Sequence, residues 1–337
     1  MKTDDLNLRA LALDKPGQTS LGGMPEGYDA LILGRLAQLA APKPLLYVAP
    51  DDARLATARD CLAFFAPEVE CISIPAWDCL PYDRVSPRND LVSERISSLV
   101  TLVAKNKKPR VVLATVNALL QRVPPRAGLA QASFALKRGM ELDTGALFAY
   151  LESNGFTRGG TVMEAGDYAV RGGIIDIFPP GGPEPVRLDL FGETLEAIKT
   201  FDPVSQRSDG TLNSLKLVPV SEVVLNEASI ARFCAGYRTS FGAVTDADPL
   251  FEAVSAGRRY PGMEHWLPLF HSSLETILDY VPDAVIFLDH LSEQACSDRW
   301  EAIDDYYRAR TEGPGALAEF SIEDYKPLPP EQMHITR

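Results

Sequence analysis

The sequence predicts an α/β protein in which two segments of the chain form one parallel-sheet module, with a small β-rich (α+β) domain inserted between them. Helical and strand-like stretches alternate over residues 28–115, as in parallel sheets, and the alternation returns after about residue 218. Between residues 160 and 203, Gly or Pro recurs every few residues around short β-like runs. The length of 337 residues fits two or three domains.

The first segment predicts helices and strands in alternation. Helical periodicity marks residues 28–40, 51–65 and 90–103, and Asp51 stands where the second of these helices needs an N-cap. Short apolar runs predict strands at residues 45–49, 69–74 and 110–115. Strands joined by helices of this length indicate a parallel sheet.

The middle segment predicts antiparallel strands, and the last segment returns to helices and one strand. The antiparallel strands are expected at residues 168–171, 174–178, 186–191 and 195–201, with breaks at Gly172-Gly173, Pro179–Gly182 and Gly192-Glu193. The last segment predicts a helix over 226–236, a buried strand over 284–289 and a long helix over 292–310. The predicted domains are therefore residues 1–132, 133–218 and 219–337.

Composition excludes several classes of function. With 33 Lys and Arg against 46 Asp and Glu, the net charge is −13, which opposes binding to a phosphate backbone in the mean field. Five cysteines without CxxC spacing and four histidines without HExxH spacing predict neither a disulfide framework nor a metal site. The polar N-terminus and the lack of a long apolar run predict a cytoplasmic protein without a membrane partner.

Residues 22–29 have the glycine spacing of a P-loop but lack the residues that bind phosphate and Mg²⁺. Gly22 and Gly27 have P-loop spacing directly before a predicted helix. A working loop continues with Lys, which contacts phosphates, and with Ser or Thr, which holds Mg²⁺. Here Tyr28 and Asp29 occupy those places, and neither supplies the missing positive charge. The sequence predicts a degenerate nucleotide loop, and no nucleotide or metal cofactor for this chain.

The apolar run Val285–Leu288 ends in Asp289-His290. An ATPase strand at this place would end in Asp-Glu, so we favour the simpler interpretation of a buried strand that ends in a polar loop.

One strand of the β-rich segment indicates a protein-binding face. Over 186–191 the apolar residues alternate, so that Val186, Leu188 and Leu190 face one side while Arg187, Asp189 and Phe191 face the other. Arginine beside an exposed aromatic is typical of interface hot spots. Arg171 belongs to the same candidate face. The alternative is a surface pair between Arg187 and Asp189 beside an incidental phenylalanine.

The segment Met163–Arg207 resembles the UvrA-binding domain shared by UvrB and the transcription-repair coupling factor (Mfd) family. The stretches Pro75–Pro87 and Pro261–Phe270 resemble the Mfd family specifically, and the resemblance runs from about Leu45 to the C-terminus. It implies a UvrB-like, helicase-like module in two parts around a docking domain that recruits UvrA to stalled RNA polymerase. Arg171, Arg187 and Phe191 match the positions that the family uses against UvrA.

Two departures limit what the resemblance implies. UvrB has an intact P-loop and an aromatic hairpin that threads damaged DNA, whereas this chain has Tyr28-Asp29 and no room for a hairpin before the helix at residue 90. The chain is therefore expected to be non-catalytic. Because it is too short to hold the family's polymerase-interacting domain and translocase motor, it is expected to be an N-terminal fragment. The family's ATP- and Mg²⁺-dependent translocation on double-stranded DNA, its contact with RNA polymerase and the C-terminal regulatory domain that masks the UvrA-binding face belong to other parts.

Two other functions remain open from the residues alone. The first is a divergent nucleotidase or helicase half that uses residues 22–29 and Asp289. The second is a DNA-backbone-binding, UvrB-like module; its candidate contacts are Arg84, Arg88, Lys105, Lys107, Lys108 and Arg110, which could equally be a solvated helix end and loop.

Overall fold

The computed structural model describes residues 17–25, 27–104, 106–244, 248–312 and 325–335, and these form two compact units. The first unit combines Met1–Ala76, Ala104–Leu120 and Ile277–Trp300. The second unit combines Trp77–Val103, Gln121–Thr276 and Glu301–Arg337. The predicted division into residues 1–132, 133–218 and 219–337 stays a prediction, and each unit is described here by itself.

The first unit contains the predicted parallel sheet. Its strand order is β12-β1-β3-β2, and every neighbouring pair is parallel. The strands are β1 (Leu45–Ala49), β2 (Glu70–Ile74), β3 (Arg110–Thr115) and β12 (Val285–Leu288). Because β12 comes from the last segment and pairs with β1, the prediction that two segments build one sheet is confirmed.

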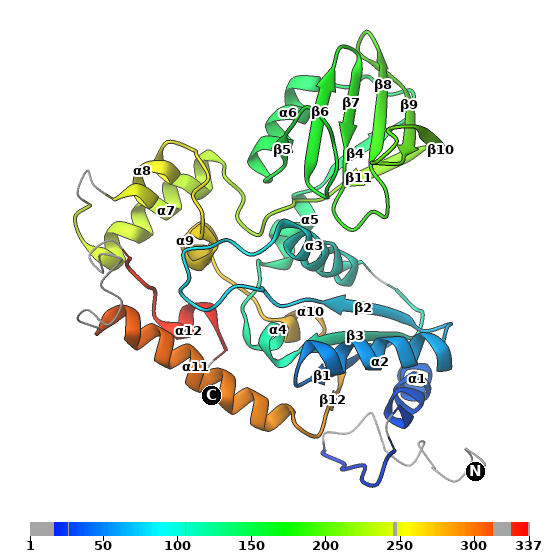
Figure 1. Ribbon diagram of the computed structural model, residues 1–337, viewed down its shortest axis with the longest axis vertical. Helices are drawn as coiled ribbons and strands as arrows, with labels where there is room; N and C mark the ends of the chain where they lie inside the picture. Colours follow the sequence, from blue (N-terminus) through cyan, green and yellow to red (C-terminus); the bar gives the residue numbers. More distant parts are fainter. Residues whose placement is uncertain (1–16, 26, 105, 245–247, 313–324, 336–337) are drawn as a thin grey trace. The chain divides into compact units, whose positions relative to one another are not determined.

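Two helices cover one face of this sheet (Figure 1). They are α1 (Tyr28–Ala40) and α2 (Asp52–Phe65), which share one apolar core with alternate residues of β1 and β3. The Asp51 side chain caps α2 by accepting a hydrogen bond from the Arg54 N–H at 2.8 Å, as predicted. Gly34 lets the helices approach closely, since a Cβ there would lie 2.5 Å from the Cβ of Ala66. Two short helices, α4 (Val116–Leu120) and α10 (Ile277–Tyr280), also belong to this unit.

The prediction that β12 is a buried strand is wrong. It lies at the edge of the sheet, and the side chains of Ile286 and Leu288 are 51% and 47% exposed. An apolar run of this length reports that a strand forms, but not how many neighbours cover it.

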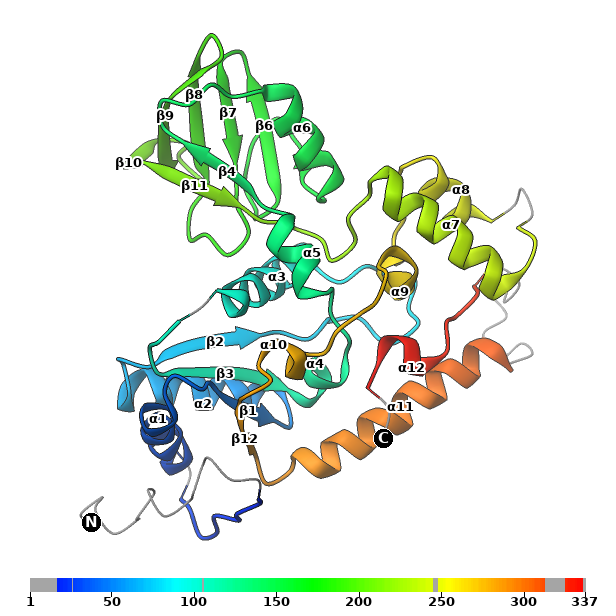
Figure 2. The ribbon, with the colours of Figure 1, turned by 180° about the vertical axis from the view of Figure 1, so that it is seen from behind.

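The second unit contains the predicted β-rich fold. Its six-stranded sheet has the order β10-β9-β8-β7-β6-β5. The strands are β5 (Thr157–Arg158), β6 (Asp167–Arg171), β7 (Ile174–Ile177), β8 (Val186–Phe191), β9 (Thr194–Phe201) and β10 (Ser208–Leu212). Helix α6 (Thr144–Ser153) and the pair β4 (Phe134–Lys137) and β11 (Ser214–Leu217) share an apolar core with one face of this sheet (Figure 2). The opposite face carries the predicted binding residues.

The rest of the second unit is mainly helical. Its helices are α3 (Asn89–Val103), α5 (Arg126–Gln131), α7 (Glu227–Phe241), α8 (Pro249–Ser255), a 3₁₀ turn (Met263–Trp266), α9 (Leu267–Phe270) and α12 (Pro330–Met333). The long helix α11 (Ser292–Thr311) has residues in both units. A capping box between Asn226 and Ser229 starts α7.

Glu222 lies at the centre of a buried polar cluster in the second unit, where it contacts Arg95, Trp77 and His271. The Glu222 carboxylate accepts hydrogen bonds from the Arg95 Nε at 2.9 Å and from the Trp77 indole N–H at 2.7 Å. The Glu222 carbonyl oxygen lies 2.9 Å from the His271 Nε2. Both charged side chains of the ion pair are at most 1% exposed, so the pair is a structural part of the interior.

Candidate functional site

Strand register places the three predicted binding residues on one face of the six-stranded sheet. Arg171 lies opposite Ile174, which lies opposite Asp189, and Phe191 follows two residues later on β8. One step further along the sheet, Asp176 lies opposite Arg187. Residues directly opposite one another share a face, as do residues two apart on one strand. This face is the one that α6 does not cover, so the prediction from alternation gives the correct side of β8.

Two tight turns bring Arg171 and Phe191 to the same end of the sheet. Gly172 and Gly192 have φ values of 60° and 61° in the turns that follow these residues, a conformation that suits glycine. The Leu190 N–H donates to the Gly173 carbonyl at 2.8 Å, which ties one hairpin to the next. A Cβ on Gly173 would lie only 2.9 Å from the backbone carbonyl oxygen of Leu190, so a side chain at this position would crowd strand β8. Phe191 is left 76% exposed at this end.

Arg187 is held more firmly than the sequence predicts. Its Nε and Nη2 donate to the two carboxylate oxygens of Asp176 at 2.7 and 2.9 Å, and its guanidinium carbon lies 4.7 Å from the centroid of the Phe201 ring. The hydrogen bond to Asp176 raises the pKa of Arg187. The Arg187 side chain is 18% exposed and that of Asp176 only 2%. Arg187 is thus a fixed, mostly covered cation at the border of the face.

The alternative pair between Arg187 and Asp189 does not form. Asp189 instead pairs with Lys199 on β9, and Arg187 pairs with Asp176 on β7. Arg171 is exposed, and its guanidinium donates to the Gly160 carbonyl. The charged residues of the face therefore have partners inside the domain, while the Phe191 ring projects from it.

Loops cover one half of this face and leave the other half open. The side-chain amide of Gln206 donates to the backbone carbonyls of Val162 and Pro203 at 3.3 and 2.7 Å. The backbone carbonyl of Gln206 accepts from the Arg187 Nη1 at 3.4 Å. Beneath these loops is a small apolar cluster formed by Val162, Ala169, Phe178 and Phe201. We call the uncovered half, with Arg171, Ile174, Asp189 and Phe191, the open face.

The predicted nucleotide loop begins α1 but shows little of a phosphate cradle. Gly27 is the residue before the helix, with a φ of 80°, and the Tyr28 N–H donates to the Pro25 carbonyl at 3.1 Å. A Cβ on Gly22 would meet no atom within 4 Å. In a P-loop the backbone N–H groups point at phosphates instead. Glu26 lies outside the described residues.

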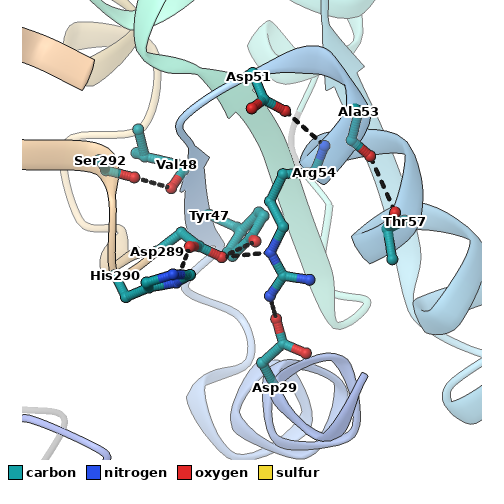
Figure 3. A network of polar contacts seen from close by, with 10 residues as sticks. All are labelled: Asp29, Tyr47, Val48, Asp51, Ala53, Arg54, Thr57, Asp289, His290 and Ser292. Carbon is teal, nitrogen blue, oxygen red and sulfur yellow. Dashed lines mark hydrogen bonds and ion pairs between the residues drawn. The ribbon is translucent and has the colours of Figure 1, made fainter. Parts of the chain in front are cut away.

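Asp29 and Asp289 are joined by an arginine of the chain itself (Figure 3). The Arg54 Nε donates to the Asp289 Oδ2 at 2.7 Å, and the Arg54 Nη2 forms an ion pair with Asp29. The Tyr47 hydroxyl donates to the same Asp289 oxygen at 2.7 Å, and the His290 Nδ1 lies 2.7 Å from the Asp289 Oδ1. Asp289 follows β12, so the predicted polar end of this strand is found, although the strand is not buried.

Burial alone would raise the pKa of Asp289, but the hydrogen bonds from Tyr47 and Arg54 hold it below its ordinary value. Burial would likewise lower the pKa of Arg54, yet the hydrogen bond to Asp289 and the nearby acidic groups raise it overall. One oxygen of each carboxylate, Oδ2, is thus paired with Arg54. Among the described residues, no group of three or more His, Cys, Asp or Glu is placed to hold a metal ion.

The basic run is less accessible than the sequence suggests. Arg110 is buried and its Nε donates to Glu70 at 2.9 Å, and Arg88 pairs with Asp90 and Asp78. Lys107 and Lys108 are exposed, while Lys105 lies outside the described residues. Arg110 therefore cannot be counted among surface contacts for DNA, because it is buried at the start of β3.

No helix in the described part of the chain has the length and apolar character of a membrane span.

Comparison with known proteins agrees with this geometry. The family model described as the UvrB interaction domain matches residues 134–223, which include the whole open face. Transcription-repair-coupling factors from Haemophilus influenzae and Rickettsia bellii are 31% and 33% identical over 83% and 81% of this chain. The one from Escherichia coli K12 is 30% identical over 94% of it. This chain is a relative of the transcription-repair-coupling factors.

The match to this family confirms the resemblance to its N-terminal, UvrB-like region. The chain spans about a quarter of the length of these relatives, at 24%, 24% and 26%. The roles of Arg171, Arg187 and Phe191 stay predictions. Sequence reasoning missed Asp176 and Ile174 beside them, since only the register between β7 and β8 brings these residues to the same face.

Proposed function

We propose that this chain is the UvrA-docking part of a transcription-repair-coupling factor and that it recruits UvrA during transcription-coupled nucleotide excision repair. The observation that carries the proposal is the open face. It presents Phe191 and Arg171 together, and it lies within the residues that match the UvrB interaction domain.

The chemistry of docking follows from these side chains. Phe191 can fill an apolar pocket on UvrA, and Arg171 can exchange its contact with a local carbonyl for an acidic or carbonyl group of the partner. Arg187 keeps β7 and β8 in register through Asp176 and offers its remaining exposed edge. A face of this kind needs neither nucleotide nor metal, so we propose a non-catalytic role in the cytoplasm.

The longer family members suggest the setting of this module. We propose that ATP-driven translocation on double-stranded DNA and contact with RNA polymerase reside in other parts of the complete protein. A C-terminal regulatory domain that masks the open face until the motor engages polymerase would make recruitment of UvrA conditional. In this scheme residues 22–29 are a structural remnant, because Asp29 and Asp289 are already engaged in ion pairs with Arg54.

Phe191→Ala is expected to weaken UvrA binding by about thirtyfold, which corresponds to ~2 kcal/mol for an interface anchor. The Arg187→Ala/Phe191→Ala variant should show no measurable binding. Isothermal titration calorimetry with purified UvrA measures both, with circular dichroism to confirm the fold. The matched control is Phe64→Ala, because Phe64 is 80% exposed but lies on α2 in the first unit. Normal binding by the double variant would refute the proposed face.

A further inference from the structure

The open face contains an exposed aliphatic side chain that the docking residues surround. Ile174 is 37% exposed, whereas the next residue on the strand, Ile175, is 1% exposed in the core on the other side of the sheet. On its own face Ile174 lies directly between Arg171 on β6 and Asp189 on β8. Phe191 stands diagonally across from it, two residues beyond Asp189.

The charged side chains on either side of Ile174 each have a polar partner elsewhere in the domain. Arg171 donates to the Gly160 carbonyl, and Asp189 pairs with Lys199 on the far side of β8. Ile174 and Phe191 are thus two apolar side chains inside a rim of charged groups with partners of their own. Interfaces concentrate their binding energy in such an apolar centre, and the polar rim excludes water from it.

We propose that Ile174 is a second apolar anchor of the docking face, and that the partner covers Ile174 and Phe191 with one continuous apolar pocket and sets an acidic group against Arg171. This inference rests on the proposed function, since it takes UvrA as the occupant. The match of residues 134–223 to the UvrB interaction domain and the continuity of Ile174 with Arg171 and Phe191 argue for that choice.

The same domain offers a matched control. Val204 is 82% exposed, more than Ile174, but it lies in the loop that follows β9. Strand β9 runs from the turn beside Phe191 to Phe201, so Val204 belongs to the opposite end of the sheet. An effect of apolar exposure in general would appear at Val204, whereas an effect of the open face would appear only at Ile174.

The test compares Ile174→Ala, Val204→Ala and Phe191→Ala with the wild-type chain in calorimetric titrations with purified UvrA. We expect Ile174→Ala to weaken binding about tenfold, while Val204→Ala leaves the Kd within about twofold. Ile174→Asp, which puts a charge into the pocket, should abolish binding although the residue is outside the core. Circular dichroism and the melting temperature of each variant show that the domain is folded.

The outcomes separate this inference from the proposed function. If Phe191→Ala weakens binding but Ile174→Ala does not, the second anchor is refuted and the docking face stands. If Val204→Ala loses as much as Ile174→Ala, the proposed centre is also wrong, because the interface would extend over the whole sheet. If the wild-type chain does not bind, or Phe191→Ala and Ile174→Ala both bind normally, the proposed function fails together with the inference.

Discussion

Glu222→Ala is expected to lower the free energy of unfolding of the second unit by about 3–5 kcal/mol, the cost of removing one partner from a buried ion pair. The Arg95 guanidinium would lose its carboxylate in an interior where the side chain is 1% exposed. The Trp77 indole N–H would lose its acceptor as well. Because Trp77, Arg95 and His271 come from different parts of the chain, their shared contact with Glu222 holds together helix α3 and two loops that are distant in sequence.

Urea denaturation followed by tryptophan fluorescence measures this loss, since two of the three tryptophans, Trp77 and Trp266, lie in the second unit. Glu252→Ala is the matched control, since Glu252 also pairs with an arginine, Arg258 at 3.0 Å, but is 69% exposed. The exposed pair is worth at most about 1 kcal/mol. A Glu222→Ala variant as stable as Glu252→Ala would mean that repacking or water replaces the buried carboxylate.

Glu222→Gln separates charge from hydrogen bonding at the same site. The amide oxygen can still accept the bond from Trp77 or from Arg95, but the negative charge is gone. We expect the free energy of unfolding of Glu222→Gln to lie between that of the wild-type chain and that of Glu222→Ala. A loss as large as that of alanine would assign the whole effect to the charge on Glu222.

Sequence reasoning succeeded where the signal is local. The alternation over Val186–Phe191 has a period of two, which directly divides a strand into two faces, and the structure buries Val186 and Leu188 as predicted. Asp51 caps α2 because the capping bond reaches only three residues along the chain. Helical periodicity, which is also a local signal, predicts the helix that begins at Tyr28.

What the sequence could not predict depends on contacts between distant residues. The sequence predicts Arg187 as an anchor on the face opposite the core, but its partner Asp176 can be identified only once β7 and β8 are paired in register. Asp289 was separated from Arg54 by 235 residues, so no spacing rule connects them. The position of β12 at the edge of the sheet is likewise a property of the strand order.

Arg54→Ala is expected to destabilise the first unit by about 3 kcal/mol at pH 7, because it removes the cation between two acidic side chains. The side chains of Asp29 and Asp289 are 7% and 3% exposed, so water cannot fully replace the guanidinium. The Tyr47 hydroxyl would remain as a donor to Asp289, but it carries no charge. Arg59→Ala is the control on the same helix, since Arg59 is 54% exposed and its ion pair is with Asp60, which is 75% exposed.

The pH dependence of this loss identifies its cause. In the wild-type chain the folded-state pKa of Asp289 lies below its ordinary value, so its contribution to stability is present above the unfolded-state pKa and is lost as pH falls through the folded-state pKa. Without Arg54, burial becomes the dominant influence and raises the pKa of Asp289 in the folded state. The folded variant then takes up a proton more readily than the unfolded chain, and acid relieves the repulsion.

The difference in stability between the wild-type chain and Arg54→Ala should therefore shrink as the pH is lowered from 7 towards about 4, the ordinary range of a carboxyl pKa. Urea titrations followed by circular dichroism at several pH values measure this difference. Arg59→Ala should be as stable as the wild-type chain at each of these pH values. A deficit that grows in acid would contradict the assigned electrostatic role. A deficit that does not change with pH would mean that Arg54 stabilises this end of the sheet through the packing of its side chain rather than through its charge.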